Sequence, residues 1–235
     1  MSGTFRRPAA LALARRAATG LVLGFVAACG GGGGGGFHLT PDSVDFSLDR
    51  DELERSIAFS SEFFDVTDCA YVEGLVESAG VRRLLRFSTF IINYGELDAI
   101  VGSPADPLPP LLASDFEYSP CHGHHHFEGW GDYTLENPAG QVVAFGHKQA
   151  FCLRDSLNYF GLDPGRAYDC DYQGISSGWG DAYPAGLDGQ WIDITGLAAG
   201  SYTLVVTVNA AGKIVEAHDV FPNTVRVPVV IPAAP

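Results

Sequence analysis

Positive charge and long apolar runs are both scarce in this chain of 235 residues. Lys and Arg together number 14, against 28 for Asp and Glu, so the formal net charge is -14 at pH 7. This balance argues against nucleic-acid binding, which depends on Lys and Arg side chains that neutralise phosphates. An acidic surface favours cationic partners instead.

The longest apolar run near the N-terminus is too short for a transmembrane helix. It extends from Ala17 to Ala28, about twelve residues where a bilayer core of ~30 Å needs about 20. Arginines precede it, at positions 6, 7, 15 and 16, and Val26-Ala27-Ala28-Cys29 ends it. This segment resembles a bacterial lipoprotein signal. We expect residues 1–28 to be a signal peptide and Cys29 to be acylated. The protein would then be exported and anchored by its lipid to a bacterial membrane, at the outer membrane or at a periplasmic or cell surface. The lipid anchor would be its only contact with the membrane.

The next segment is a glycine tether, and the rest of the chain is one domain. Residues 29–36 hold Cys29 and seven consecutive glycines, which form a flexible linker. The chain as a whole is 46% hydrophobic and 11% aromatic, which is enough for a core and excludes extensive disorder over most of its length. We therefore expect a single domain over residues 37–235.

Strand patterns predominate in this domain, and helical periodicity is weak. A strand is expected over 83–93, which is rich in branched and aromatic residues. A hairpin is expected where residues 132–136 and 141–145 flank the turn signal Asn137-Pro138-Ala139-Gly140. Further strands are expected at 190–195, 200–209 and 226–231. Short helices are expected only at 51–60 and 156–160. The predicted fold is all-β, a single antiparallel β-sandwich-like domain with long functional loops.

Four cysteines remain if Cys29 carries lipid. They are Cys69, Cys121, Cys152 and Cys170. None has the CxxC spacing of a zinc ribbon or a redox motif. An even number in an exported domain predicts two disulfides, for which three connectivities exist.

Four of the seven histidines lie between His122 and His126. His122, His124 and His126 would share one face of an extended segment, with His125 on the other. Imidazole nitrogens suit Cu(II), Zn or Ni. On a regular strand the outer pair would be roughly 13 Å apart, too far for metal–nitrogen bonds of ~2 Å. The segment must therefore bend, and Gly123 permits such a bend. Three histidines alone fit zinc hydrolysis, copper storage or a structural metal equally well.

Several motifs in order resemble the lysyl oxidase family. Cys121-His-Gly-His-His-His126 is similar to its copper-binding segment, and Gly146-His-Lys-Gln-Ala-Phe-Cys-Leu153 to a second family motif. Asp181-Ala-Tyr183 and Gln190-Trp-Ile-Asp-Ile-Thr195 match its Asp-x-Tyr and Gln-Trp-Ile-Asp-Ile-Thr signature, and Leu84-Leu-Arg-Phe87 also fits. The resemblance covers most of residues 65–230.

The resemblance implies a copper amine oxidase of the protein-lysine 6-oxidase type. His122, His124 and His126 would bind Cu2+, and Lys148 would join an oxidised Tyr183 to form lysine tyrosylquinone. With O2 as oxidant, the family converts peptidyl-lysine to an aldehyde and releases ammonia and hydrogen peroxide. Here the substrate would be peptidyl-lysine or a small primary amine. Asp132 lies near a histidine position of the family, and we take it as a hypothetical general base.

The resemblance also extends to disulfides and to calcium. It favours a Cys121–Cys170 bridge, which leaves Cys69 with Cys152. The family's Ca2+ site is matched loosely, by Asp219 and Asn223 with Glu216 shifted by one residue. The alternative hypothesis is a non-catalytic lipoprotein that binds copper or zinc on the same scaffold.

Overall fold

The structure is a computed structural model that describes residues 39–148, 151–161, 165–218 and 220–233. The chain divides into two units, Met1–Gly36 and Phe37–Pro235, and the described residues belong to the second. The predicted signal peptide, the lipidated Cys29 and the glycine tether lie outside the described residues. Among these residues, no helix is both long enough and apolar enough to cross a bilayer.

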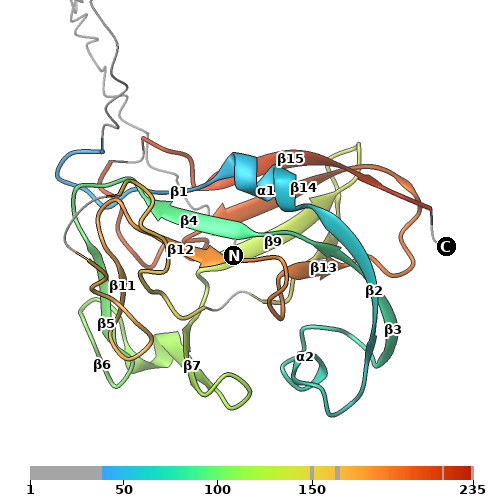
Figure 1. Ribbon diagram of the computed structural model, residues 1–235, viewed down its shortest axis with the longest axis horizontal. Coiled ribbons are helices and arrows are strands. Elements are labelled where there is room, and N and C mark those ends of the chain that lie inside the picture. Colours follow the sequence, from blue (N-terminus) through green and yellow to red (C-terminus); the bar gives the residue numbers. More distant parts are fainter. Residues whose placement is uncertain (1–38, 149–150, 162–164, 219, 234–235) are drawn as a thin grey trace, which may run out of the picture. The chain divides into compact units, whose positions relative to one another are not determined.

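The most regular part of the domain is an antiparallel sheet with the strand order β10-β9-β14-β15 (Figure 1). Its strands are β9 (Gly131–Glu136), β10 (Val142–Phe145), β14 (Gly200–Val208) and β15 (Thr224–Ile231). Buried and exposed residues alternate along β15, so one face of the sheet covers the core. The predicted 132–145 hairpin and the two C-terminal strands are thereby confirmed.

Smaller antiparallel sheets complete the described fold. One has the order β13-β3-β2 and another β1-β4-β12. Their strands are β1 (Phe46–Leu48), β2 (Ala58–Phe64), β3 (Gly80–Arg86), β4 (Thr89–Asn93), β12 (Gly180–Tyr183) and β13 (Trp191–Asp193). A third sheet joins β11 (Gln173–Ile175), β5 (Ala99–Ser103) and β6 (Asp106–Pro107), and β7 (Phe116–Ser119) pairs with β8 (His124–Phe127). The all-β prediction is confirmed.

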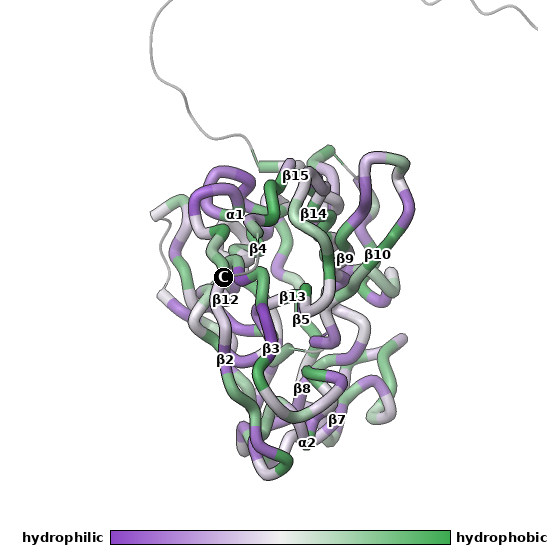
Figure 2. Tube along the Cα trace, turned by 90° about the vertical axis from the view of Figure 1, so that its right-hand side faces the viewer, coloured by the Kyte–Doolittle hydropathy of each residue, from purple (hydrophilic) through white to green (hydrophobic). Residues whose placement is uncertain are grey.

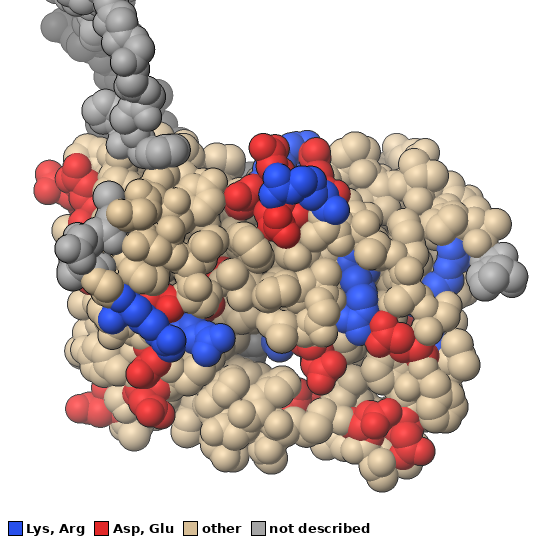
Figure 3. All heavy atoms as spheres, viewed as in Figure 1, with Lys and Arg blue, Asp and Glu red and all other residues tan. Residues whose placement is uncertain are grey.

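Helical segments are short. Helix α1 (Arg50–Ser56) begins where the Asp49 side chain accepts a hydrogen bond from the Glu52 amide, which is a standard N-cap. Its only buried residue is Leu53, while its charged residues form the mixed acidic and basic cluster over α1 in Figure 3. The helix predicted for 51–60 therefore ends early, because Ala58 already begins β2. The helix predicted for 156–160 is wrong, since Leu157 forms a bridge with Gly180.

The predicted strand over 83–93 is two strands in the structure, β3 and β4, which belong to different sheets. Hydrophilic and hydrophobic stretches follow one another along β3 (Figure 2). A short helix, α2 (Cys69–Val72), and a 3-10 turn, η1 (Ala113–Asp115), were not expected from the sequence. Figures 1 and 2 agree that α2 and β7 lie at the same end of the domain, and this end carries the histidines.

The core is assembled from the inner faces of these sheets. Its largest fully buried side chains include Trp130, Tyr133, Phe87 and Phe127. Phe151 and Tyr183 also belong to this core, and their ring centroids are 4.5 Å apart. Packing of this density holds side chains in fixed rotamers. The predicted site residues at the edge of this core therefore lie on rigidly packed segments.

Candidate metal and cofactor site

The three alternate histidines are placed by the β7–β8 hairpin. His124 and His126 lie on β8 and point to one face, while His122 lies in the turn that precedes the strand. Gly123 has a φ of 70°, a left-handed conformation that bends the chain between His122 and His124. The bend predicted from the sequence is present at the predicted glycine.

This bend brings the three imidazoles together. His122 Nδ1 is 3.2 Å from His126 Nε2, and one nitrogen of each of the three rings lies within 4.8 Å of the others. A single ion with metal–nitrogen bonds of ~2 Å fits such a spacing. His125 points away and packs against Tyr118, with ring centroids 5.1 Å apart.

The protonation of these rings also suits metal binding. Burial lowers the pKa of His124, with smaller contributions from nearby positive charges. Burial, followed by the positive charge of Lys148, lowers the pKa of His126 to about 3. Metal ligands must be neutral imidazoles, and His126 is neutral at any pH near 7.

Lys148 follows β10 and is half-buried. Its ammonium group donates a hydrogen bond of 3.0 Å to the carbonyl oxygen of Asp188, and Nζ lies 5.5 Å from the centroid of the Phe151 ring. Burial lowers the Lys148 pKa, although the charges of Glu73 and Asp188 oppose this shift. A lowered pKa increases the fraction of neutral amine, which is the nucleophilic form.

Tyr183 is the last residue of β12 and is buried against Phe151. Its hydroxyl group lies 2.8 Å from the carbonyl oxygen of Cys152 and also contacts the carboxylate of Asp181. Burial, followed by the charge of Asp181, raises the pKa of Tyr183 well above its usual value.

Asp181 is a fully buried carboxylate that sequence reasoning did not select. Burial raises its pKa to about 7, although hydrogen bonds from Tyr183, the Arg154 amide and the Ser156 hydroxyl act against the shift. A phenol has one proton, so Tyr183 can donate to only one of its two oxygen partners. Both contacts are hydrogen bonds at once when Asp181 is protonated and donates to the phenol oxygen.

One cavity of about 310 Å³ brings the predicted residues together. Its lining includes the three histidines, Lys148, Phe151, Tyr183 and Asp188. A second cavity of about 320 Å³ shares His126 and Lys148 with it. Three separate segments, which carry the histidines, Lys148 and Tyr183, thus meet around one cavity.

The hypothetical base Asp132 does not belong to this group. It lies on β9, where it pairs with Thr207 of β14, on the strand face opposite Tyr133. It is not part of the lining of either cavity within the described residues. The carboxylate that contacts the Tyr183 hydroxyl is Asp181, and the sequence contained a signal for this contact. Residues two apart on a strand share a face, so the Asp-x-Tyr motif puts Asp181 beside Tyr183.

Glu73 is a second residue that the sequence did not reveal. It follows α2, and one of its carboxylate oxygens lies 3.9 Å from His122 Nδ1. The other oxygen accepts a hydrogen bond from the Ser119 hydroxyl, whose oxygen in turn accepts a hydrogen bond of 3.0 Å from the His122 amide. Glu73 and Ser119 therefore orient the turn that carries His122.

Two disulfides are present, but the predicted pairing is wrong. The bridges are Cys69–Cys121 and Cys152–Cys170, with Cα atoms 5.8 Å and 5.3 Å apart. The β7–β8 turn places Cys121 next to α2, which begins at Cys69. Cys152 follows the bridge between Phe127 and Phe151 and faces the segment that leads into β11. Disulfides need Cα atoms within about 7 Å, and these packed segments satisfy that limit.

The loosely matched calcium residues lie partly outside the described residues, because Asp219 does. The Glu216 carboxylate accepts hydrogen bonds from the side-chain amides of Asn209 and Asn223, both at 2.6 Å. It also accepts one from the backbone amide of Phe46 at 2.7 Å. In the described part of the chain, the side-chain oxygen of Asn223 is buried without a hydrogen-bond partner. An orphaned oxygen beside a carboxylate fits a hard cation, so calcium binding stays a prediction.

Comparison with known proteins shows which family this chain is similar to. The lysyl oxidase family model matches residues 57–230. Lysyl oxidase homolog 2B of Danio rerio is 30% identical over 198 residues, which cover 80% of this chain and 25% of the relative. Human lysyl oxidase homolog 1 is 40% identical over 148 residues, 62% of this chain and 24% of the relative.

Human lysyl oxidase homolog 3 is 38% identical over 141 residues, which cover 58% of this chain and 17% of the relative. The matched part is thus a quarter or less of each of these three relatives. The range matched by the family model includes the histidines, Lys148 and Tyr183. The matched family model spans most of the chain, and the chain belongs to the lysyl oxidase family.

Proposed function

We propose that this protein is a copper- and quinone-dependent amine oxidase. One primary amine, one O2 and one water would give one aldehyde, one ammonia and one hydrogen peroxide. The observation that carries the proposal is the meeting of three histidines, Lys148 and Tyr183 around one cavity. Membership of the lysyl oxidase family supports the same chemistry.

Each residue has a defined task. His122, His124 and His126 would hold copper, and Lys148 and Tyr183 would form lysine tyrosylquinone. Bound copper and O2 would supply the oxidation of the Tyr183 ring, which zinc cannot supply because it has no redox chemistry, and the quinone would supply the electrophile for the substrate amine.

The surrounding residues prepare these two side chains. Burial favours the neutral amine of Lys148, and the Asp188 carbonyl fixes its position. The pKa of Asp181 is about 7, so part of the population is ionised at neutral pH, and this ionised form can accept the proton that leaves the Tyr183 hydroxyl. Phe151 packs against Tyr183, and its ring also lies next to Lys148 Nζ.

The substrate is proposed to be peptidyl-lysine or another primary amine. The net charge of -14 attracts cationic amines over long range. If this attraction contributes to encounter, kcat/KM for an amine will fall as ionic strength rises, because salt screens the field. A kcat/KM that is independent of salt would contradict this part of the proposal.

The deciding experiment is to load the metal-free protein with Cu2+ in air and to follow a quinone stain, intact mass and hydrogen peroxide release from an amine. Lys148→Arg and Tyr183→Phe should both abolish the crosslink and the peroxide. Lys213→Arg is the matched control, because Lys213 pairs with Asp115 on the surface. Copper binding with an uncrosslinked Lys148 would contradict the oxidase and support the alternative, a non-catalytic copper- or zinc-binding protein.

The leader suggests where the protein works. We propose that it is exported and anchored through lipid on Cys29. Metabolic labelling with a fatty acid should mark the wild type and not Cys29→Ser, and the variant should leave the membrane fraction. An unlabelled wild type would contradict the anchor without affecting the proposed chemistry.

A further inference from the structure

The loop over residues 184–190 joins the end of β12, at Tyr183, to the start of β13, at Trp191. Two internal hydrogen bonds shape it, from the Leu187 amide to the Pro184 carbonyl at 2.9 Å and from the Gln190 amide to the Leu187 carbonyl at 3.2 Å. Leu187 and Asp188 line the cavity that contains Lys148 and Tyr183. The loop therefore forms part of the wall of the candidate site.

Carbonyl groups of this loop accept hydrogen bonds from two positively charged side chains, those of Lys148 and Arg86. The Asp188 carbonyl accepts the hydrogen bond from Lys148 Nζ. The carbonyls of Ala185 and Leu187 accept hydrogen bonds from Nη1 of Arg86, at 2.8 Å and 3.3 Å. Arg86 lies at the end of β3 and is not part of the cavity lining.

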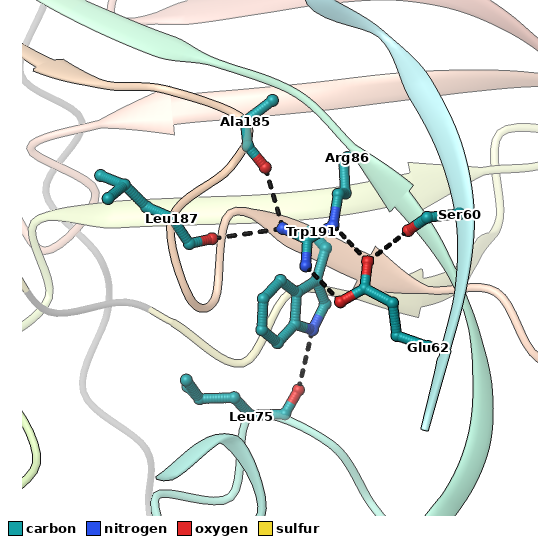
Figure 4. A network of polar contacts seen from close by, with 7 residues as sticks. All are labelled: Ser60, Glu62, Leu75, Arg86, Ala185, Leu187 and Trp191. Carbon is teal, nitrogen blue, oxygen red and sulfur yellow. Dashed lines mark hydrogen bonds and ion pairs between the residues drawn. The ribbon is translucent and has the colours of Figure 1, made fainter. Parts of the chain in front are cut away.

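Arg86 itself is firmly fixed, as Figure 4 shows. Its Nε and Nη2 donate to the two carboxylate oxygens of Glu62 at 2.8 Å and 2.7 Å, and the Ser60 hydroxyl donates to the same carboxylate at 2.6 Å. The guanidinium group also lies 4.5 Å from the ring centroid of Trp191. A planar group with five donors can make all these contacts at once, whereas an ammonium group cannot.

We propose that Arg86 is a positioning residue for Lys148. It fixes the Ala185 and Leu187 carbonyls, and the short loop transmits this to the Asp188 carbonyl, which holds the Lys148 amine at the cavity that Tyr183 also lines. The proposal rests on the proposed function, in which Lys148 must reach Tyr183. Within the described residues, Arg86 makes no hydrogen bond with Lys148 or Tyr183, so it acts through the loop.

The chain offers an unusually direct test, because it has only two lysines, Lys148 and Lys213. Metal-free protein is treated briefly with an isotopically coded acid anhydride, and peptide mass spectrometry gives the acylation rate at each lysine. Arg86→Gln should raise the Lys148 rate by about fivefold, the factor that corresponds to the net contribution of one hydrogen bond. The rate at Lys213, which pairs with Asp115 at 2.8 Å, should not change.

Arg226→Gln is the matched control. It removes another arginine–glutamate pair, with Glu136, that joins β15 to β9. Its Lys148 rate should equal that of the wild type. An unchanged Lys148 rate in Arg86→Gln would overturn the proposal, and so would an equal increase in Arg226→Gln.

A milder variant keeps the test decisive if Arg86→Gln fails to fold. Glu62→Gln keeps Arg86 and the shape of its partner but removes the carboxylate charge that anchors it, so the Lys148 rate should rise less than in Arg86→Gln. No rise in folded Glu62→Gln also contradicts the proposal. Because labelling uses metal-free protein, its result is separate from the proposed function, which fails only if copper-loaded wild type forms no crosslink.

Discussion

Gly189 and the side chain of Lys148 are so close that no Cβ fits between them. A Cβ at Gly189 would lie 2.6 Å from Lys148 Cδ and 2.8 Å from Lys148 Cβ. The φ of Gly189 is +79°, which other residues rarely adopt. The loop thus passes directly over the aliphatic part of Lys148 before β13 begins.

We predict that Gly189→Ala displaces Lys148 and impairs formation of the crosslink. Misplacement of a reacting group by about 1 Å can cost about 100-fold in rate, so the quinone stain after copper addition should develop up to about 100-fold more slowly. The three histidines are untouched, so Cu2+ affinity should stay the same. Stopped samples stained for quinone, together with a copper titration, measure both.

Gly140→Ala is the control for backbone strain. Gly140 has a similar φ of +76°, but a Cβ there would meet nothing within 4 Å. Both variants should lose about 1 kcal/mol of unfolding free energy from the unfavourable φ. Only Gly189→Ala should slow the crosslink, and equal slowing in both would show that general destabilisation is the cause.

Local sequence patterns predicted the parts of the site that depend on short-range geometry. Alternation over His122, His124 and His126 requires a bend, and Gly123 provides it. The hairpin over 132–145 follows from alternation and a four-residue turn. In these cases the residues that decide the structure are within ten or so positions of one another.

Contacts between distant segments could not be predicted in this way. The pairing of Cys69 with Cys121 depends on where α2 packs, and α2 itself has no periodic signal in four residues. The raised pKa of Asp181 results from burial, and this burial depends on how segments distant in the sequence pack together. The role of Arg86 depends likewise on a loop about 100 residues further along the chain.

Asp181 should make stability depend on pH. Its folded pKa is about 7 and its unfolded pKa is about 4. A raised folded pKa means that the protonated form is favoured by folding. The contribution is fully present below about pH 4 and is lost as pH rises through about 7. Asp181→Asn, which cannot ionise, should therefore gain stability relative to the wild type as pH rises from about 4 to 8.

Urea denaturation of metal-free protein across this pH range measures the difference. Asp132→Asn is the control, because Asp132 lies half-exposed on β9, outside both cavities. Its stability relative to the wild type should be nearly constant over the same range. A constant difference between wild type and Asp181→Asn would contradict the buried, protonated carboxyl.

The two faces of β8 should differ sharply in copper affinity. His126 points to the cavity with His122 and His124, whereas His125 packs on Tyr118. We predict that His126→Gln weakens Cu2+ binding by at least about 100-fold, more than loss of an outer contact usually costs. His125→Gln should change affinity by less than about threefold, the usual scale of a surface substitution. Competition with a chelator of known affinity compares the two variants, and equal losses would contradict the assignment.

The two disulfides should stabilise the domain by different amounts. Cys69–Cys121 closes a loop with a sequence separation of 52 residues, and Cys152–Cys170 one of 18. Chain entropy then gives about 4 kcal/mol for the first bridge and about 3 kcal/mol for the second. The double variants Cys69→Ser/Cys121→Ser and Cys152→Ser/Cys170→Ser, unfolded in urea, test this order.

The Cys69→Ser/Cys121→Ser variant should also weaken Cu2+ binding, because Cys121 precedes His122 and its bridge ties that turn to the segment carrying Glu73. The Cys152→Ser/Cys170→Ser variant should leave Cu2+ binding closer to wild type and should slow crosslinking, since the Cys152 carbonyl contacts the Tyr183 hydroxyl. Non-reducing peptide mapping establishes the pairing itself. A peptide that joins Cys121 to Cys170 would contradict the pairing on which the predictions for the two double variants depend.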